Sequence, residues 1–262
     1  MLQNLPMFEE DLLFPNWPAP AAIKSLVTRR TGGASSAPFN ELNLATHVGD
    51  DSAIVIENRR RLKASLRVDE ICWLNQVHGT RVVEAVNTEN HLVLPSSDAC
   101  WTKTPMLACA IMTADCLPIL VCNRAGTRVL AIHAGWRGLV SGVVPSALKK
   151  ANMIPGETYV WLGPAIGPSA YQVGSEVLEA FSSSSAFEDV DVAQAFTADD
   201  DSDTKKHFMC DLYQLVRMQL EKLGHVSIYG GDQCTYSQDK DYFSYRRDGQ
   251  TGRMASLIWI DR

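Results

Sequence analysis

Residues 107–138 read LACAIMTADCLPILVCNRAGTRVLAIHAGWRG and hold three apolar runs in close succession. The runs Leu107–Thr113, Ile119–Cys122 and Arg128–His133 have the length and composition of buried β-strands. Two residues with chemically useful side chains, Cys116 and His133, lie beside or at the ends of these runs. Because strand ends are where a sheet delivers side chains to a cleft, we predict three strands here with a functional site at their ends.

Further strands and helices are predicted along the rest of the chain from apolar periodicity and turn residues. We expect strands at Ile23–Thr28, Ile71–Gln76, Arg81–Val86, Thr158–Gly163, Val226–Tyr229 and Met254–Ile260, and helices at Ser52–Leu66, Leu139–Asn152, Ser175–Phe181 and Asp211–Leu223. Pro145 must begin or kink the helix in which it lies. The strands and helices do not alternate in a regular βαβ order, which favours an α+β fold with helices covering sheets.

Two segments depart from this pattern. Residues 1–22 carry four prolines, which predict an extended N-terminal arm laid over the body without a regular element. Residues 182–206 begin with four serines and carry seven acidic residues, which predict a mobile acidic insertion, with a possible helical turn at Val190–Phe196. No linker divides the chain, so we expect one domain over residues 1–262.

The composition is that of a soluble globular protein, with 46% hydrophobic residues and a net charge of −6. A pI near 5.5 and the lack of a basic stripe argue against binding to nucleic acid. The chain has no apolar run of membrane-spanning length and no leader with a basic and an apolar region. Seven cysteines, several of them in apolar strands, fit a reducing compartment, and we expect a cytoplasmic protein.

His78, Cys116 and His133 are the candidate metal ligands. Glycine or proline follows each of them within a few residues, as expected where strand ends turn around a ligand. Two imidazoles and a thiolate suit zinc, and three protein ligands leave a fourth position for water or substrate. The same residues could also form a thiolate–imidazole nucleophile pair, since both chemistries need a thiol of lowered pKa beside a histidine.

Other polar groups are expected near this cleft. Asp115 could orient a ligand or accept a proton, or else it only forms a turn. Gln76 and Arg137 belong to the same motifs as the ligands. The run Tyr242–Asp248 mixes aromatic residues with Arg246 and Arg247, and it could stack on a planar base and hold an anion, or form an edge strand with a charged turn. The chain has no dinucleotide-binding glycine motif, no P-loop and no His-Glu-x-x-His.

Several of these motifs resemble those of the YfiH family, also called laccase-domain, multicopper polyphenol oxidase or peptidoglycan editing factor proteins. The resemblance begins near Arg30–Gly33 and Leu42-Asn43-Leu44 and runs to the C-terminus. It is carried by Gln76–Gly79, Met112–Pro118, His133–Gly138, Trp161–Pro168, Phe243–Asp248 and Thr251–Ser256.

The resemblance implies a single-domain, layered α/β sandwich with mixed sheets, related to the catalytic domain of cytotoxic necrotizing factor. It also implies that His78, Cys116 and His133 bind Zn²⁺. The activities implied are phosphorolysis of adenosine, inosine and methylthioadenosine, and deamination of adenosine. For phosphorolysis, Arg30, Arg59, Arg137, Arg246 and Arg253 are the available cations, and Arg137 is favoured because it follows a ligand motif. We also expect Gln76, Asn43 and Tyr245 to contact substrate, and the protein to be a monomer or weak dimer.

Three alternatives stay open at this point. The first is an amide hydrolase that edits a nucleotide-linked muramyl-amino acid precursor. The second is a structural zinc in a binding module, which would need a fourth protein ligand. The third is a copper-dependent polyphenol oxidase, but the six histidines include no His-x-His pair for a copper cluster. Cu²⁺ could still occupy a site of N and S ligands in vitro.

Overall fold

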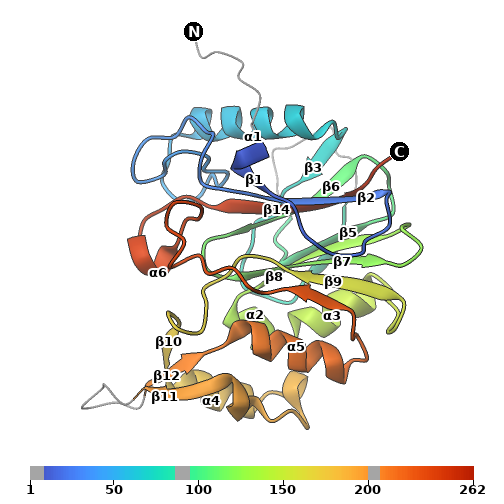
Figure 1. The fold of residues 1–262 in the computed structure, drawn as a ribbon, viewed down its shortest axis with the longest axis vertical. Coiled ribbons are helices and arrows are strands. Elements are labelled where there is room, and N and C mark those ends of the chain that lie inside the picture. The colour runs from blue at the N-terminus through green and yellow to red at the C-terminus, as the bar shows by residue number, and fades with distance from the viewer. Residues whose placement is uncertain (1–8, 86–94, 200–206) are drawn as a thin grey trace.

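Two mixed β-sheets stack face to face at the centre of the molecule (Figure 1). The computed structural model describes residues 9–85, 95–199 and 207–262. The five-stranded sheet has the order β1 (Leu12–Leu13), β2 (Ile23–Thr28), β14 (Met254–Ile260), β6 (Leu107–Thr113) and β3 (Glu70–Cys72). The six-stranded sheet has the order β13 (Ile228–Gly230), β9 (Thr158–Leu162), β7 (Leu117–Asn123), β8 (Val129–Ala134), β5 (Ala99–Thr102) and β4 (Val82–Glu84).

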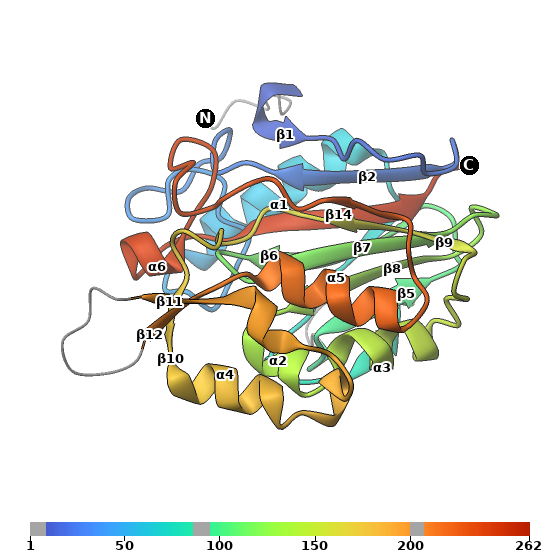
Figure 2. The ribbon, with the colours of Figure 1, turned by 60° about the horizontal axis from the view of Figure 1, so that its bottom comes forward.

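Helices cover the outer face of each sheet. Helix α1 (Ser52–Leu66) lies on the five-stranded sheet, and α2 (Trp136–Val140), α3 (Val143–Lys150) and α5 (Leu212–Lys222) lie on the six-stranded one (Figure 1). A small antiparallel sheet of β10 (Gln172–Gly174), β12 (His207–Cys210) and β11 (Phe196–Asp199) lies beyond these helices with α4 (Ser175–Ser182), as Figure 2 shows. The shorter elements are the 3-10 turns at Glu9–Asp11, Ser185–Phe187 and Val192–Ala195, and α6 (Tyr245–Asp248).

The alternation of side chains along β6 explains the layering. Leu107, Cys109 and Ile111 point into the core between the two sheets, while Ala108, Ala110 and Met112 join the core beneath α1. All seven residues of the strand are buried, because successive side chains point to opposite faces and both faces are covered. This explains why the strand reads as a continuous apolar run.

The α+β, layered sandwich with mixed sheets is confirmed, and several element bounds agree with the sequence expectation. The predicted helix over 139–152 is instead two helices, α2 and α3, separated at Gly142, which adopts a φ of +87°. Pro145 lies in the first turn of α3, where the backbone N–H that proline lacks would have no helical partner.

The two unusual segments are more regular than expected. In the N-terminal arm, β1 pairs with β2 through Leu12 and Leu13, whereas no regular element was predicted there. Residues 182–199, the first part of the predicted acidic insertion, form two 3-10 turns and β11. The reason is apolar burial, since Phe187, Val192 and Ala195 pack into the core beside α4 and α5. Residues 200–206, the rest of that segment, lie outside the described residues.

Other differences are shorter strands and missed ones. The strand predicted at Ile71–Gln76 ends at Cys72, and Val86 of the strand predicted at Arg81–Val86 lies outside the described residues. Besides β1, four of the described strands were not predicted, namely β5, β10, β11 and β12. The run Tyr242–Asp248 contains the helical turn α6 instead of an edge strand, because the Ser244 hydroxyl caps it by accepting a hydrogen bond from the Arg247 backbone N–H.

None of the helices in residues 9–85, 95–199 and 207–262 has both the length and the apolar character needed to cross a membrane.

Replacing Phe187 with alanine tests whether residues 182–199 are part of the core. Phe187 is 3% exposed and makes an edge-to-face contact with Phe181 at 5.1 Å between ring centroids. We expect Phe187→Ala to lower the free energy of unfolding by about 3–5 kcal/mol in urea titrations. Phe14→Ala, at a ring that is 55% exposed, is the matched control, with an expected loss below about 1 kcal/mol. Equal losses in the two variants would contradict the packing described.

Candidate functional site

The pairing of β7 with β8 and the turns around them bring Cys116 and His133 together. Cys116 lies immediately before β7, and His133 lies in β8 opposite Pro118. His78 reaches the same point from the segment between β3 and β4, where its backbone adopts a φ of +58°. The sequence prediction of a site at strand ends therefore has a direct structural counterpart.

The three side chains form a compact donor cluster. Their nitrogen and sulfur ligand atoms all lie within 4.8 Å of one another, and the Cys116 Sγ lies 3.7 Å from the His78 Nε2. Zinc bonds to nitrogen and sulfur imply a separation of about 3.6 Å between such donors in a tetrahedral site. The cluster therefore fits a zinc ion, and in the described part of the chain it is the one group of three such ligands.

A buried carboxylate, Asp98, holds two of the ligands. Its Oδ1 lies 2.8 Å from the His133 Nδ1, and its oxygens accept hydrogen bonds from the backbone N–H groups of His78 and Gly79 at 2.9 and 2.7 Å. Burial acts to raise the pKa of Asp98, but the hydrogen bonds from His133 and Gly79 keep it below its ordinary value. The ionised carboxylate fixes the His133 Nδ1 as a donor and leaves Nε2 for the cluster.

Cys116 is a thiolate near neutral pH. Burial acts to raise its pKa, but the charge and hydrogen bond of His133, followed by those of His78, lower it to about 6. The pKa of His133 is raised to about 9, because Cys116 and Asp98 outweigh the effect of burial. A thiolate is the form that binds a metal and also the form that attacks a carbonyl carbon. Because only a neutral imidazole ligates a metal, metal binding would release the proton that His133 otherwise carries on its Nε2.

Gly135 leaves the room that the cluster needs. A Cβ at this position would lie 2.8 Å from the His78 Cδ2 and 2.9 Å from the Cys116 Sγ. Both distances are shorter than a normal van der Waals contact. Any side chain here would displace His78 and Cys116. This steric limit explains why position 135 of the His133–Gly138 motif is a glycine.

The cluster opens into a pocket of about 360 Å³. The wall includes all three ligands and six more residues that the sequence singled out, namely Gln76, Asp115, Arg137, Tyr245, Arg246 and Arg253. It also includes His47, Trp136 and Tyr171, which sequence reasoning did not select. Trp136 stands inside a quoted motif and could have been chosen, whereas nothing in the sequence marks His47 or Tyr171.

Three residues expected to bind substrate do not line this pocket. The Arg30 guanidinium donates to the carbonyl groups of Asn40 and Asp239 and lies over the Phe243 ring. Asn43 is fully buried and bonds to the backbone around it. Arg59 is turned towards the Trp73 ring, 4.2 Å from its centroid. These three positions support the loops that build the wall.

Two polar residues of the wall are fixed by the protein. Asp115 accepts a hydrogen bond from the Thr235 hydroxyl on one oxygen and from the Arg246 backbone N–H on the other, both at 2.7 Å. The Gln76 side chain both donates to and accepts from the backbone of Met112, at 2.8 Å each. These hydrogen bonds tie the segment that carries His78 to β6, and the segment that carries Cys116 to α6.

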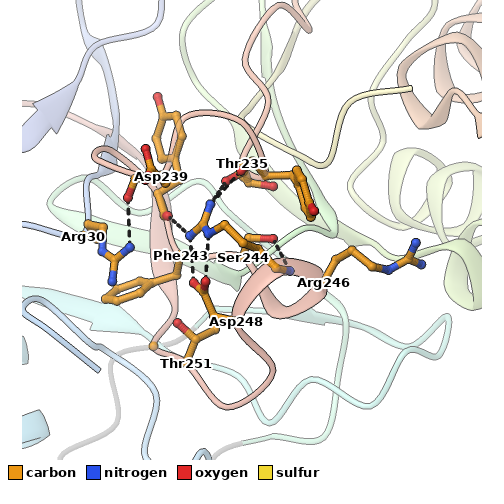
Figure 3. Close-up of polar contacts among 12 residues, drawn as sticks. Arg30, Thr235, Asp239, Phe243, Ser244, Arg246, Asp248 and Thr251 are labelled. Atoms are coloured by element: carbon orange, nitrogen blue, oxygen red, sulfur yellow. Dashed lines mark hydrogen bonds and ion pairs between the residues drawn. The ribbon is translucent and has the colours of Figure 1, made fainter. Parts of the chain in front are cut away.

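Arg247 anchors the turn that carries Tyr245 and Arg246. Its guanidinium donates to the carbonyl groups of Thr235, Tyr236 and Tyr242 and pairs with Asp248. Figure 3 shows this network and the Arg246 side chain pointing away from it. Arg247 is therefore structural, and the turn is held so that its neighbours face the pocket.

Comparison with known proteins shows the family of the chain. The family model described as "Multi-copper polyphenol oxidoreductase laccase" matches residues 24–261. The chain belongs to this family. It is 48% identical to a purine nucleoside phosphorylase of Pseudomonas aeruginosa, with 95% of this chain and 98% of that protein covered. The purine nucleoside phosphorylase YfiH of Escherichia coli is 44% identical, with the same shares covered.

Solved structures of similar proteins support the family assignment. A crystal structure of a Neisseria meningitidis protein shares 44% identity, with a TM-score of 0.88 and with 96% of this chain and 100% of that chain covered. The YfiH protein of Bacillus licheniformis shares 26% identity, with a TM-score of 0.81 and with 91% and 93% covered. The resemblance to the YfiH family inferred from the motifs is thus confirmed.

Two glycine substitutions in the same site test the steric argument. Gly135→Ala should weaken zinc binding by at least about tenfold, because its methyl group displaces His78 and Cys116. Gly79→Ala is the matched control, since a Cβ there meets nothing closer than 3.6 Å, and its zinc affinity should stay within about threefold of wild type. Competition with a chromophoric chelator measures both. Similar affinities in the two variants would show that Gly135 does not shape the cluster.

Proposed function

We propose that this protein is a zinc-dependent purine nucleoside enzyme that phosphorolyses adenosine, inosine and methylthioadenosine and deaminates adenosine. The observation that carries the proposal is a three-donor cluster at the wall of a compact pocket with aromatic and cationic sides. The names of the P. aeruginosa and E. coli relatives support the phosphorylase part.

The size and lining of the pocket suit a nucleoside. A volume of about 360 Å³ is at the lower end of small-molecule sites, which bury most of a ligand between apolar walls. Trp136, Tyr171 and Tyr245 offer ring faces for a purine base, and Tyr245 is 60% exposed at the mouth. A nucleotide-linked muramyl precursor would need a longer groove.

His78, Cys116 and His133 would hold the metal. A zinc ion bound by three protein ligands supplies a Lewis acid and an acidified water. The protein's own contribution is to present the thiolate and two oriented imidazoles, with Asp98 fixing the tautomer of His133.

Phosphorolysis requires positioned charge around a phosphate. In this reaction a phosphate oxygen forms a bond to C1′ of the ribose while the bond from C1′ to the purine N9 breaks. The electron pair leaves on the purine, which takes up one proton, and the products are the free base and ribose 1-phosphate. Arg137, Arg246 and Arg253 are the arginines of the wall available for these contacts.

Deamination requires a proton for the departing ammonia. Asp115 is the one carboxylate in the described wall, so we propose it as the group nearest this task. Its two oxygens already accept hydrogen bonds from Thr235 and Arg246, which favours an orienting role over free proton exchange.

One observation favours a second candidate. Cys116, His133 and Asp98 form a chain of thiolate, imidazole and carboxylate, the arrangement of a cysteine nucleophile with its base and orienting acid. Such a chain could cleave the amide of a muramyl-amino acid precursor, as the peptidoglycan-editing alternative requires. A copper oxidase ranks last, because the described residues offer one three-donor cluster and no second one for a multicopper centre.

Product analysis with a cysteine variant tests the proposal. Zinc-loaded protein incubated with adenosine and phosphate should yield adenine and ribose 1-phosphate, and without phosphate it should yield inosine. Cys116→Ala should lower both rates by at least about a hundredfold, because it removes a ligand shared by both reactions. Cys122→Ala, a control at a cysteine in the core between the sheets, should keep both reaction rates close to those of wild type. A folded Cys116→Ala variant that retains activity would refute the role of the cluster, and no product from wild type would favour amide hydrolysis.

A further inference from the structure

One corner of the pocket, which we call the His47 corner, is made of three basic side chains, His47 and Arg253 on the wall and Arg59 behind them. His47 and Arg253 line the pocket, and the Arg59 guanidinium lies behind them, 3.6 Å from the sulfur of the wall residue Met112. The pKa of His47 is lowered by burial and then by the charges of Arg253 and Arg59, which reflects how close the three groups are.

Neither arginine of the corner has a carboxylate partner. In the part of the chain that the structure describes, Arg59 and Arg253 form no ion pair, although each is only partly exposed. Burial lowers the pKa of Arg253, against the opposing charges of Cys116 and Asp115, and lowers that of Arg59 to about 10. A partly buried charge without a counter-ion in direct contact costs free energy, so an anion from solution has an electrostatic reason to bind here.

The corner is also rigid. One nitrogen of Arg253 donates to the carbonyl groups of Thr251 and Gly252, at 2.8 and 2.9 Å. The Arg59 Nε donates to the Leu44 carbonyl at 2.8 Å, and its plane lies against Trp73. Both guanidiniums are therefore held in place before a ligand arrives, which lowers the entropic cost of binding.

Asn43 fixes the loop that carries His47 to the strand end that carries Arg253. Its Oδ1 accepts hydrogen bonds from the backbone N–H groups of Ala45 and Arg253, both at 3.0 Å. The Leu44 N–H in turn donates to the Arg253 carbonyl. The two segments are more than 200 positions apart in the chain, and this buried amide joins them.

The other two arginines of the pocket, Arg137 and Arg246, are exposed, whereas Arg59 and Arg253 are half-buried. Arg137 lies over the Trp136 ring at 4.4 Å, and Arg246 lies over the Tyr171 ring at 5.2 Å and donates to the Gln172 carbonyl. Arg253 also lies over a ring, that of Tyr245, at 5.8 Å, so burial is what separates the two groups. A half-buried guanidinium is less well solvated than an exposed one and therefore gains more from binding an anion such as phosphate.

We infer that the His47 corner is a binding subsite for a phosphate dianion, with Arg253 and His47 donating to its oxygens and Arg59 adding positive charge from behind. The inference rests on the proposed function, in which inorganic phosphate is a substrate, and it assigns that phosphate to Arg253 instead of the Arg137 favoured by the sequence. The same chemistry would hold the phosphate group of a nucleoside monophosphate.

Steady-state kinetics of paired arginine variants test this assignment. Arg253→Met should raise the KM for phosphate by at least about tenfold and shift the KM for adenosine much less. His47→Ala, a second variant at an exposed residue, should raise the KM for phosphate by about threefold or more. Arg137→Met should raise the KM for adenosine and shift the KM for phosphate much less. Arg262→Met, at a side chain that is 73% exposed, controls for loss of charge.

A binding measurement separates this inference from the proposed function. Inorganic phosphate should raise the melting temperature of zinc-loaded wild type, and this shift should disappear in Arg253→Met even if wild type forms no ribose 1-phosphate. If only adenosine monophosphate gives a shift that depends on Arg253, the subsite holds the phosphate of a nucleotide. A shift and a KM for phosphate that depend on Arg137 and not on Arg253 or His47 would overturn the inference.

Discussion

The hydrogen bonds of the buried Asp98 carboxylate are the constraint on which the site depends. One oxygen holds the imidazole of His133, and the pair together hold the backbone of His78 and Gly79. Asp98 stands just before β5, whereas His78 comes from the segment that precedes β4 and His133 from β8. An ionised carboxylate in a fully buried position needs such donors. The same bonds that satisfy it also fix the donor geometry of the cluster.

The layered fold explains how a rigid site can open to solvent. Strands β6, β7 and β8 are buried on both faces. The backbone that follows β6 and the backbone at the end of β8 therefore have little conformational freedom. The pocket forms where these ends meet α6 and the loop around His47, which come from other parts of the chain. His133 thus comes from a buried strand and Cys116 from the turn beside one, whereas His78 comes from the segment between β3 and β4, which hydrogen bonds to Asp98 tie to the core.

Local features were predictable from the sequence and long-range ones were not. The runs that form β2, β6, β14 and α1 are continuous or periodic, and their bounds could be read directly. The three ligands stand in motifs with turn glycines and prolines. Asp98, His47 and Tyr171 gain their roles only through contacts across the fold, so no spacing marks them. Arg30 and Asn43 show the reverse, since both belong to recognisable motifs but brace the wall of the pocket and do not line it.

The central claim is that His78, Cys116 and His133 hold one zinc ion with a position left open towards the pocket. Anomalous diffraction at the zinc absorption edge, from crystals of the zinc-loaded protein, tests it most directly. We expect a single strong peak about 2.0–2.3 Å from two histidine nitrogens and the Cys116 sulfur, with a non-protein fourth ligand facing Arg253 and Tyr171. A pocket without a peak, or a fourth protein ligand closing the site, would contradict the account.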